Sequence, residues 1–341
     1  MSYTIEVSGL TKSFGKSRAL AGLDLRVEPG QVFAVLGPNG AGKTTAVRIL
    51  STLIAPDGGT ARVAGYDVIE EPHKVRAAIS LTGQLTAVDG LLTGEENLLM
   101  MARLRHLGRR ARRARTEELL EQFDLQEARG RRVSSYSGGM RRRLDLALSL
   151  VSGPPVIFLD EPTTGLDPRS RRGLWDAVKT LAGSGTTILL TTQYLEEADQ
   201  LADRIAVIDD GRVVAEGTAE ELKARVGSET VELFFSDQRM LAEAVKAIER
   251  RHGRARAASP APRQDRERLS LLLASDGSAS AVRGLLETME AADVAVDRMA
   301  LHRPTLDEVF LNLTERRADR GPELHAKGVP ERRADRGPER I

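Results

Sequence analysis

The spacing of apolar positions along the chain predicts strands and helices in a regular order. Buried strands are indicated by short apolar runs at 32–36, 156–160, 186–192 and 204–209. Helical patterns near 168–182 and 195–201 separate the later runs. Strands that alternate with helices predict a parallel sheet covered on both faces, and DDGRVVAEGT after the last run predicts an edge hairpin.

The first half of the chain also predicts elements outside this sheet. Antiparallel strands are indicated at 3–10 and 20–27, and a hairpin is indicated over 60–68. Further on we expect a helix at 72–78 and a strand at 78–84, followed by helical stretches at 93–129 and 137–151. Thr93 is a good capping residue for the first helical stretch. The predicted fold class is α/β, with a mixed sheet core, an antiparallel N-terminal subdomain and a helical subdomain.

The pattern changes near Arg225. Residues 229–314 predict a β-α-β-α-β-α order and a small α+β domain, with a mobile loop at GRARAASPAPRQDRE. After it, ERRADRGPE occurs twice without an apolar face, which is typical of a disordered tail. We therefore expect a first domain at residues 1–227, with a helical subdomain at about 85–135. A C-terminal domain at 228–314 and a tail at 315–341 would follow.

Composition narrows the possible classes of protein. Fifty basic and forty-nine acidic residues give no overall bias toward nucleic acid. The absence of cysteine excludes disulfides, thiolate metal sites and a cysteine nucleophile. The N-terminus does not have the pattern of a signal peptide, and no apolar run approaches the ~20 residues of a membrane helix. We therefore expect a cytoplasmic protein whose role at a membrane would depend on a partner.

A glycine-rich loop follows the strand at 32–36 and precedes a helical pattern. Its spacing, Gly37-x-x-x-x-Gly42-Lys43-Thr44, is that of a phosphate-binding loop in the strand–loop–helix context that the motif needs. Glycines let the backbone N–H groups approach phosphate oxygens, and the helix start adds its positive dipole end. The candidate residues for a nucleoside triphosphate are Gly37, Pro38, Asn39, Gly40, Ala41, Gly42, Lys43, Thr44 and Thr45. Lys43 would reach the outer phosphates, and Thr44 would bind Mg²⁺.

Two further segments carry groups that suit phosphate chemistry. The strand VIFLD ends in Asp160, a candidate Mg²⁺ ligand, and Glu161 follows, placed to orient or deprotonate an attacking water. Alone, this pair would read as a solvated acidic turn, but the phosphate-binding loop upstream favours the catalytic interpretation. Ser137, Gly138 and Gly139 open a helix and offer a second anion-binding cradle.

Taken together, these segments resemble the ATP-binding cassette (ABC) ATPases, which have a P-loop NTPase fold. GPNGAGKTT, SLTGQ, YSGGM, VIFLDEPTTGLD and TTQYLEEAD occur in that family's order over about residues 3–225. Within the family, TTQYLEEADQLADRIAVIDDGRVVAEGT and RPTLDEVFLNLT look like daunorubicin/doxorubicin-resistance-type exporters. The resemblance implies ATP and Mg²⁺ as cofactors and ATP hydrolysis as the activity.

The resemblance also implies roles for individual residues. Phe14 matches the aromatic residue that stacks on adenine, although the sequence also allows a core position for it. Gln84 matches the glutamine that touches Mg²⁺ and the attacking water. Ser137–Gly139 match the signature that grips the γ-phosphate from the opposite protomer, and Asp167 matches a residue that communicates across the dimer. Glu161 matches the catalytic carboxylate.

The chain departs from the family pattern at two positions. Gln193 stands where the family has its switch histidine, so we expect a polar γ-phosphate sensor beside Glu161 that does not titrate near pH 7. Turnover would then be slower and would lack an imidazole step in its pH dependence. Met140 stands where the signature usually ends in a polar residue. The N–H groups of Gly138 and Gly139 remain, so we expect binding to survive.

The basic run RHLGRRARRAR at 105–115 has two interpretations. The favoured one is a solvated helix face balanced by the acidic EELLEQ that follows. The alternative is a surface near anionic lipid head groups or RNA. The resemblance places the contact with a transmembrane partner nearer 85–100.

The resemblance leads to one main function and two alternatives. The main expectation is the ATPase subunit of a drug or antibiotic exporter, peripheral on the cytoplasmic face of the cell membrane. Its expected partners are a second copy, head to tail across two ATP, and a separate transmembrane permease. No nucleic acid is expected. The alternatives are an importer ATPase with a regulatory C-terminal domain and a soluble ABC ATPase that acts on nucleic acid or ribosomes.

Overall fold

The computed structural model describes residues 3–83, 88–225, 229–252, 262–302 and 304–310. The predicted tail at 315–341 lies outside the described residues, as does most of the predicted loop at 253–267.

The central sheet has the strand order β10-β9-β3-β8-β7-β6. Its strands are β3 (Val32–Leu36), β6 (Ile79–Thr82), β7 (Val156–Asp160), β8 (Thr187–Thr192), β9 (Arg204–Asp209) and β10 (Arg212–Gly217). All neighbours are parallel except β9 and β10, which form the predicted antiparallel edge hairpin. Every residue of β3, β7 and β8 is buried, as their apolar runs predicted.

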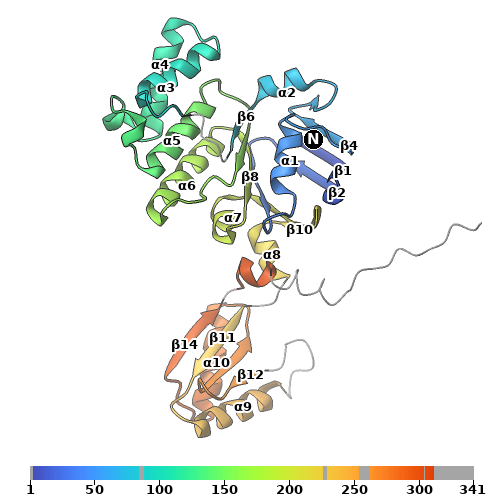
Figure 1. Cartoon of the computed structure of the whole chain (residues 1–341). Helices are drawn as coiled ribbons and strands as arrows, with labels where there is room; N and C mark the ends of the chain where they lie inside the picture. The colour runs from blue at the N-terminus through green and yellow to red at the C-terminus, as the bar shows by residue number, and fades with distance from the viewer. Residues whose placement is uncertain (1–2, 84–87, 226–228, 253–261, 303, 311–341) are drawn as a thin grey trace, which may run out of the picture.

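A second, antiparallel sheet packs beside the central one. Its order is β2-β1-β4-β5, with β1 (Ile5–Phe14), β2 (Ser17–Val27), β4 (Gly58–Val63) and β5 (Tyr66–Asp67). Helix α1 (Lys43–Leu50) shares one hydrophobic cluster with this sheet and with one face of the central sheet. Helix α2 (Pro72–Ala78) follows β5, and Figure 1 shows it at the upper end of the molecule. This arrangement holds the loop before α1 at the carboxyl end of β3.

Helices cover the other face of the central sheet. They are α5 (Gly138–Ser149), α6 (Pro168–Gly183), α7 (Leu195–Leu201) and α8 (Ala219–Ala224). The helices α3 (Gly94–Leu104) and α4 (Arg109–Gln122) project beyond α5 as a helical subdomain (Figure 1), and 3₁₀ turns lie at Gln126–Ala128 and Val133–Ser135. The predicted cap of α3 is present, because Thr93 and Glu96 form a reciprocal capping box. The predicted mixed sheet, antiparallel subdomain and helical subdomain are therefore confirmed.

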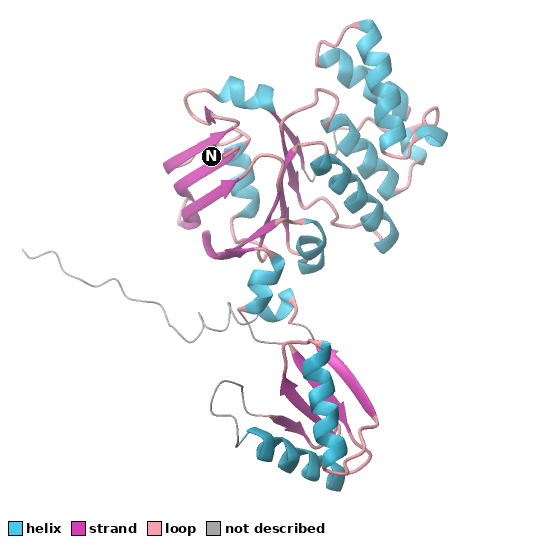
Figure 2. Cartoon of the chain, turned by 180° about the vertical axis from the view of Figure 1, so that it is seen from behind, coloured by secondary structure: helices cyan, strands magenta, loops and turns pink. Residues whose placement is uncertain are grey.

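The C-terminal sheet has the order β12-β13-β11-β14, and all its neighbours are antiparallel. Its elements are β11 (Thr230–Phe234), α9 (Gln238–His252), β12 (Arg263–Asp265), β13 (Ser270–Ala274), α10 (Ala279–Ala291) and β14 (Arg298–His302). Figure 2 shows these elements as a separate body of strands and helices. The β-α-β-β-α-β order is that of a ferredoxin-like fold. Strand β12 corrects the predicted loop, since its sequence, RQD, has no apolar residue to mark it.

After β14 the chain returns to the first part of the molecule. Residues 306–310 are helical, and in Figure 1 this short red helix lies beside α8. Leu306 and Val309 are 3% and 2% exposed. Both belong to the cluster that the helices α3–α8 form with the central sheet, and Leu222 of α8 is another member. The first core therefore includes residues from near the C-terminal end of the described chain.

Candidate nucleotide-binding site

The loop between β3 and α1 packs tightly against neighbouring backbone. A Cβ at Gly37 would collide with the carbonyl oxygen of Ile208, and one at Gly42 would collide with that of Ala19. Gly42 also has a φ of 104°, which L side chains rarely adopt. The glycine spacing seen in the sequence is thus required by the shape of the loop.

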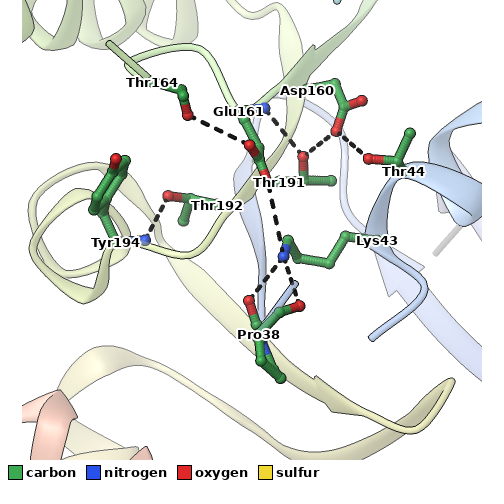
Figure 3. Close-up of polar contacts among 10 residues, drawn as sticks. Pro38, Lys43, Thr44, Asp160, Glu161, Thr164, Thr191, Thr192 and Tyr194 are labelled. Carbon is green, nitrogen blue, oxygen red and sulfur yellow. Dashed lines mark hydrogen bonds and ion pairs between the residues drawn. The ribbon is translucent and has the colours of Figure 1, made fainter. Parts of the chain in front are cut away.

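Lys43 is buried at the base of this loop. Its Nζ donates hydrogen bonds to the carbonyls of Gly37 (2.8 Å) and Pro38 (2.9 Å) and lies 3.8 Å from the Glu161 carboxylate (Figure 3). Burial lowers the pKa of Lys43, and the charges of Glu161 and Asp160 oppose that shift. The ammonium group is therefore held between the loop and the two carboxylates at the end of β7.

Asp160 joins the loop to the centre of the sheet. Its Oδ1 accepts hydrogen bonds from the hydroxyls of Thr44 (3.1 Å) and Thr191 (2.5 Å), and its side chain is almost fully buried. A hydroxyl and a carboxylate that converge in this way are hard oxygen donors of the kind that Mg²⁺ prefers. The residues present therefore fit a magnesium ion, which Thr44 and Asp160 would hold. Gln84, the other predicted ligand, lies outside the described residues.

Glu161 has a left-handed backbone, with a φ of 49°. Its N–H donates to the backbone oxygen of Thr191 at 3.1 Å and lies 3.2 Å from the Oγ1 of the same residue. The hydroxyl of Thr164 lies 3.4 Å from the Glu161 carboxylate. Sequence reasoning missed Thr191, which contacts both acidic residues. Its only signal is its place at the end of a buried strand, in TTILLTT.

A cavity of about 450 Å³ brings together three distant parts of the sequence. Gln193, which follows β8, lines it together with Glu161 and the phosphate-binding loop. The full lining is Ala19, Asn39, Gly40, Gly42, Lys43, Thr44, Thr45, Glu161, Thr164 and Gln193. The predicted catalytic residues Lys43, Glu161 and Gln193 therefore lie around one space.

The predicted signature residues lie elsewhere. Ser137 caps α5 by accepting a hydrogen bond from the Met140 N–H at 3.2 Å, and neither Ser137 nor Gly138 lines the cavity. Both are exposed, whereas Gly139 packs so closely on Ser170 of α6 that a Cβ would collide with it. The side chain of Met140 packs against the helical cluster.

Phe14 lies at the end of β1 and is 51% exposed, so the core position that the sequence allowed for it is wrong. The Lys12 ammonium lies 5.7 Å from its ring centre. Asp167 caps α6 by accepting hydrogen bonds from the N–H groups of Arg169 and Ser170, both at 3.0 Å. Hydrogen bonds from the side chain and backbone of Ser170 lower the pKa of Asp167.

A buried carboxylate four residues after Gln193 was not predicted from the sequence. Glu197 of α7 is fully buried, and its Oε1 accepts a hydrogen bond from Trp175 Nε1 at 3.3 Å. Its Oε2 has no hydrogen-bond partner within the described residues. Burial raises the pKa of Glu197, and the neighbouring side chains of Thr192, Thr163 and Trp175, together with the charge of Arg171, offset that shift only in part.

Comparisons with known proteins agree with this geometry. The sequence profile of the ABC transporter family matches residues 20–164. The chain is 52% identical over 310 residues to the daunorubicin resistance ATP-binding protein DrrA3 of Streptomyces coeruleorubidus, covering 91% of this chain and 95% of that protein. The chain belongs to the ABC transporter family. It is an ATP-binding, ATP-hydrolysing subunit of the daunorubicin/doxorubicin-resistance type, as the resemblance implied.

Another sequence relative covers a similar length, whereas solved structures cover about two thirds of the chain. The Nod factor export ATP-binding protein I of Paraburkholderia xenovorans is 38% identical over 92% of the chain and 97% of its own length. A solved ATP-binding subunit of an ABC transporter has a TM-score of 0.58 at 27% identity, covering 65% of this chain and 92% of its own. A dimeric cassette bound to ADP and Pi has a TM-score of 0.56 at 26% identity, covering 63% of this chain and 98% of its own.

No helix in the described ranges is long and apolar enough to cross a membrane.

Proposed function

We propose that this ABC ATPase powers the export of an amphipathic, drug-like compound through a separate transmembrane partner, from the cytoplasmic face of the membrane. One observation carries the proposal. The identity to the daunorubicin resistance protein extends over 91% of the chain and so includes the C-terminal unit. The solved ATP-binding subunit covers only 65% of the chain. The chain is thus similar to a drug-resistance protein, and at lower identity to a Nod factor export ATP-binding protein, beyond the part that the solved cassette covers.

The working unit that we propose is a head-to-tail dimer of two copies. Gly37–Thr45 of one copy and Ser137–Gly139 of the other would hold each ATP. The exposure of Ser137 and Gly138 and their absence from the lining of the cavity support this arrangement. The free N–H groups and the dipole end of α5 suit them to a phosphate of the opposite protomer.

Within each site, we propose the following division of roles. Lys43 binds the outer phosphates, and Thr44, Asp160 and Gln84 hold Mg²⁺, which neutralises phosphate charge when bound. Glu161 orients or deprotonates the attacking water, and Gln193 senses the γ-phosphate through its amide. Phe14 stacks on adenine, for which its exposed ring is suited.

A groove between the helical subdomain and the central sheet is the surface that we propose for the transmembrane partner. It has a volume of about 360 Å³ and is lined by residues after α1, around α2 and β6, and on α3 and α5. Leu53 and Met101 are among its lining residues. Leu53 is 60% exposed and Leu91, before α3, is 77% exposed. Such apolar side chains suit contact with another protein.

We also keep the division of the chain as a proposal. Residues 1–227 would form the ATP-binding domain and 228–314 a small α+β domain, and the repeat-containing tail at 315–341 lies outside the described residues. The C-terminal sheet lies at the end of the molecule away from α2 and α4 in Figure 1. That placement favours a role in regulation or dimerisation over one at the groove.

The test is transport by the chain together with a membrane protein of about six spans encoded beside it. Inverted vesicles that contain both proteins should accumulate a fluorescent anthracycline when ATP is added, because their cytoplasmic face is outside. Vesicles with Glu161→Gln should not. ATP hydrolysis without accumulation of any amphipathic dye, or uptake in the opposite direction, would contradict the export proposal.

A further inference from the structure

The junction between α3 and α4 carries arginines that the ATPase site does not use. They are Arg103, Arg105, Arg109, Arg110, Arg112 and Arg113, which we call the arginine patch. All are exposed except Arg112, which is half-buried. None forms an ion pair with an acidic residue in the described part of the chain. The patch is therefore a surface of uncompensated positive charge.

The acidic residues that follow in the sequence do not neutralise the patch. Glu117 pairs with Arg129 at 3.0 Å, and Glu118 pairs with Arg115 at 2.5 Å. Both glutamates thus interact with arginines outside the patch. The acidic segment thus balances Arg115 at the end of the basic run, as the sequence suggested, but it does not reach the exposed arginines of the patch.

The patch also opposes the electrostatics of its own helix. The first turn of α4 holds no acidic residue, and its N-cap, Gly108, provides no side-chain hydrogen bond. Positive side chains near a helix N-terminus are unfavourable to the helix dipole, and like charges at i and i+4, such as Arg109 and Arg113, repel each other. An anionic surface against the patch would relieve both effects.

Position and an apolar neighbour identify the kind of surface. Leu104 lies within the patch and is 64% exposed. Arg105 lines the groove that we propose for the transmembrane partner, so the patch continues that surface outward. Figure 1 shows α4 and α2 at the same end of the molecule. Basic residues around an exposed apolar side chain are typical of surfaces that lie on a membrane.

We propose that the arginine patch binds the head groups of anionic lipids around the transmembrane partner. This inference rests on the proposed function, because only docking in the groove would turn the patch toward the bilayer. The arginines contribute electrostatic attraction and Leu104 a shallow apolar contact. The contact would add a lipid-dependent share to the binding of the ATPase at the membrane.

The test uses the full chain and lipid vesicles that lack any partner. We expect flotation with vesicles containing phosphatidylglycerol, none with pure phosphatidylcholine, and release in high salt. Replacing Arg109, Arg110 and Arg113 by Gln should lower the partition coefficient on the order of a hundredfold. The matched control replaces Arg263, Arg266 and Arg283 of the C-terminal unit by Gln and should bind as the wild type does.

Three outcomes would overturn the inference: no binding to phosphatidylglycerol vesicles, equal loss in both variants, or binding to RNA in place of vesicles. Thermal unfolding of each variant separates lost binding from lost folding. ATP hydrolysis by the isolated chain is measured alongside, since the patch lies outside the catalytic cavity. Normal ATP hydrolysis without vesicle binding would contradict only this inference. Absence of ATP binding would contradict the proposed function as well.

Discussion

Glu161, the proposed catalytic carboxylate, has a left-handed backbone. A left-handed conformation at a residue other than glycine costs about 1–3 kcal/mol and persists only where neighbours enforce it. Here the hydrogen bonds of its N–H to Thr191 enforce it, and they direct the carboxylate toward Lys43. In this conformation the carboxylate of the proposed base lies 3.8 Å from the ammonium group of Lys43.

Glu161→Gln should lower ATP turnover on the order of 10²- to 10⁴-fold, because an amide cannot accept the proton of the attacking water. ATP binding should remain, and the dimer should accumulate in ATP, as size-exclusion chromatography would show. Glu196→Gln, at a mostly exposed residue of α7, is the control and should turn over normally. Unchanged turnover in Glu161→Gln would refute the assigned role.

Glu197→Gln tests how the buried carboxylate of α7 affects the pH dependence of stability. The pKa of Glu197 is raised from 4.5, so the folded state holds this proton more tightly than the unfolded state. The free energy of unfolding of the wild type should therefore fall, relative to the variant, as the pH rises above 4.5. Urea unfolding between about pH 4 and 8 measures this difference. Parallel curves for the two proteins would show that Glu197 does not titrate as burial requires.

At the scale of elements, signals carried by neighbouring residues were read correctly, whereas a short strand that depends on its partner was missed. Thr93 caps α3 as predicted because a capping box depends on residues only three positions apart. Strand β12 was missed because its pairing with β13, and not its own sequence, makes it a strand. The exposure of Phe14 and the contacts of Thr191 likewise depend on partners distant in the chain. The sequence motifs identified the site, but the residue that supports Asp160 and Glu161 required the fold.

Ser137→Ala separates two roles of one helix cap. Loss of the cap on α5 should cost about 1 kcal/mol of stability. If the hydroxyl also binds a phosphate of the opposite protomer, ATP turnover should fall about tenfold or more besides. Ser278→Ala removes an equivalent cap from α10, where Ser278 accepts from the Ala281 N–H at 3.1 Å.

The control variant, Ser278→Ala, should lose a similar amount of stability and keep its ATP turnover. Equal turnover in the two variants, measured at a temperature where both are folded, would mean that Ser137 only caps its helix.

At the scale of the whole molecule, the chain enters its first core twice. Leu306 is buried in the same cluster as Leu222, although the strands and helices of the C-terminal unit lie between them in the sequence. The C-terminal unit is thus attached to the first core at both of its ends. Loss of either attachment would expose apolar surface on the ATP-binding part.

Leu306→Ala should destabilise the ATP-binding part by about 2–5 kcal/mol, the usual cost of emptying a buried leucine site. In thermal unfolding, the transition that ATP raises should move to lower temperature. Leu301→Ala, at a half-exposed leucine of β14, is the control and should leave that transition in place. A shift confined to a transition that does not respond to ATP would assign Leu306 to the C-terminal unit instead.

Residues on both sides of the C-terminal unit pack in one hydrophobic core, and this affects when that core can be completed during synthesis. When the ribosome has released residue 225, every motif of the ATP site is present, yet the hydrophobic surface beside α8 still lacks Leu306 and Val309. All strands of the C-terminal sheet are synthesised before those residues emerge to cover that surface. The first core would therefore be completed only after residues 229–302 have been synthesised.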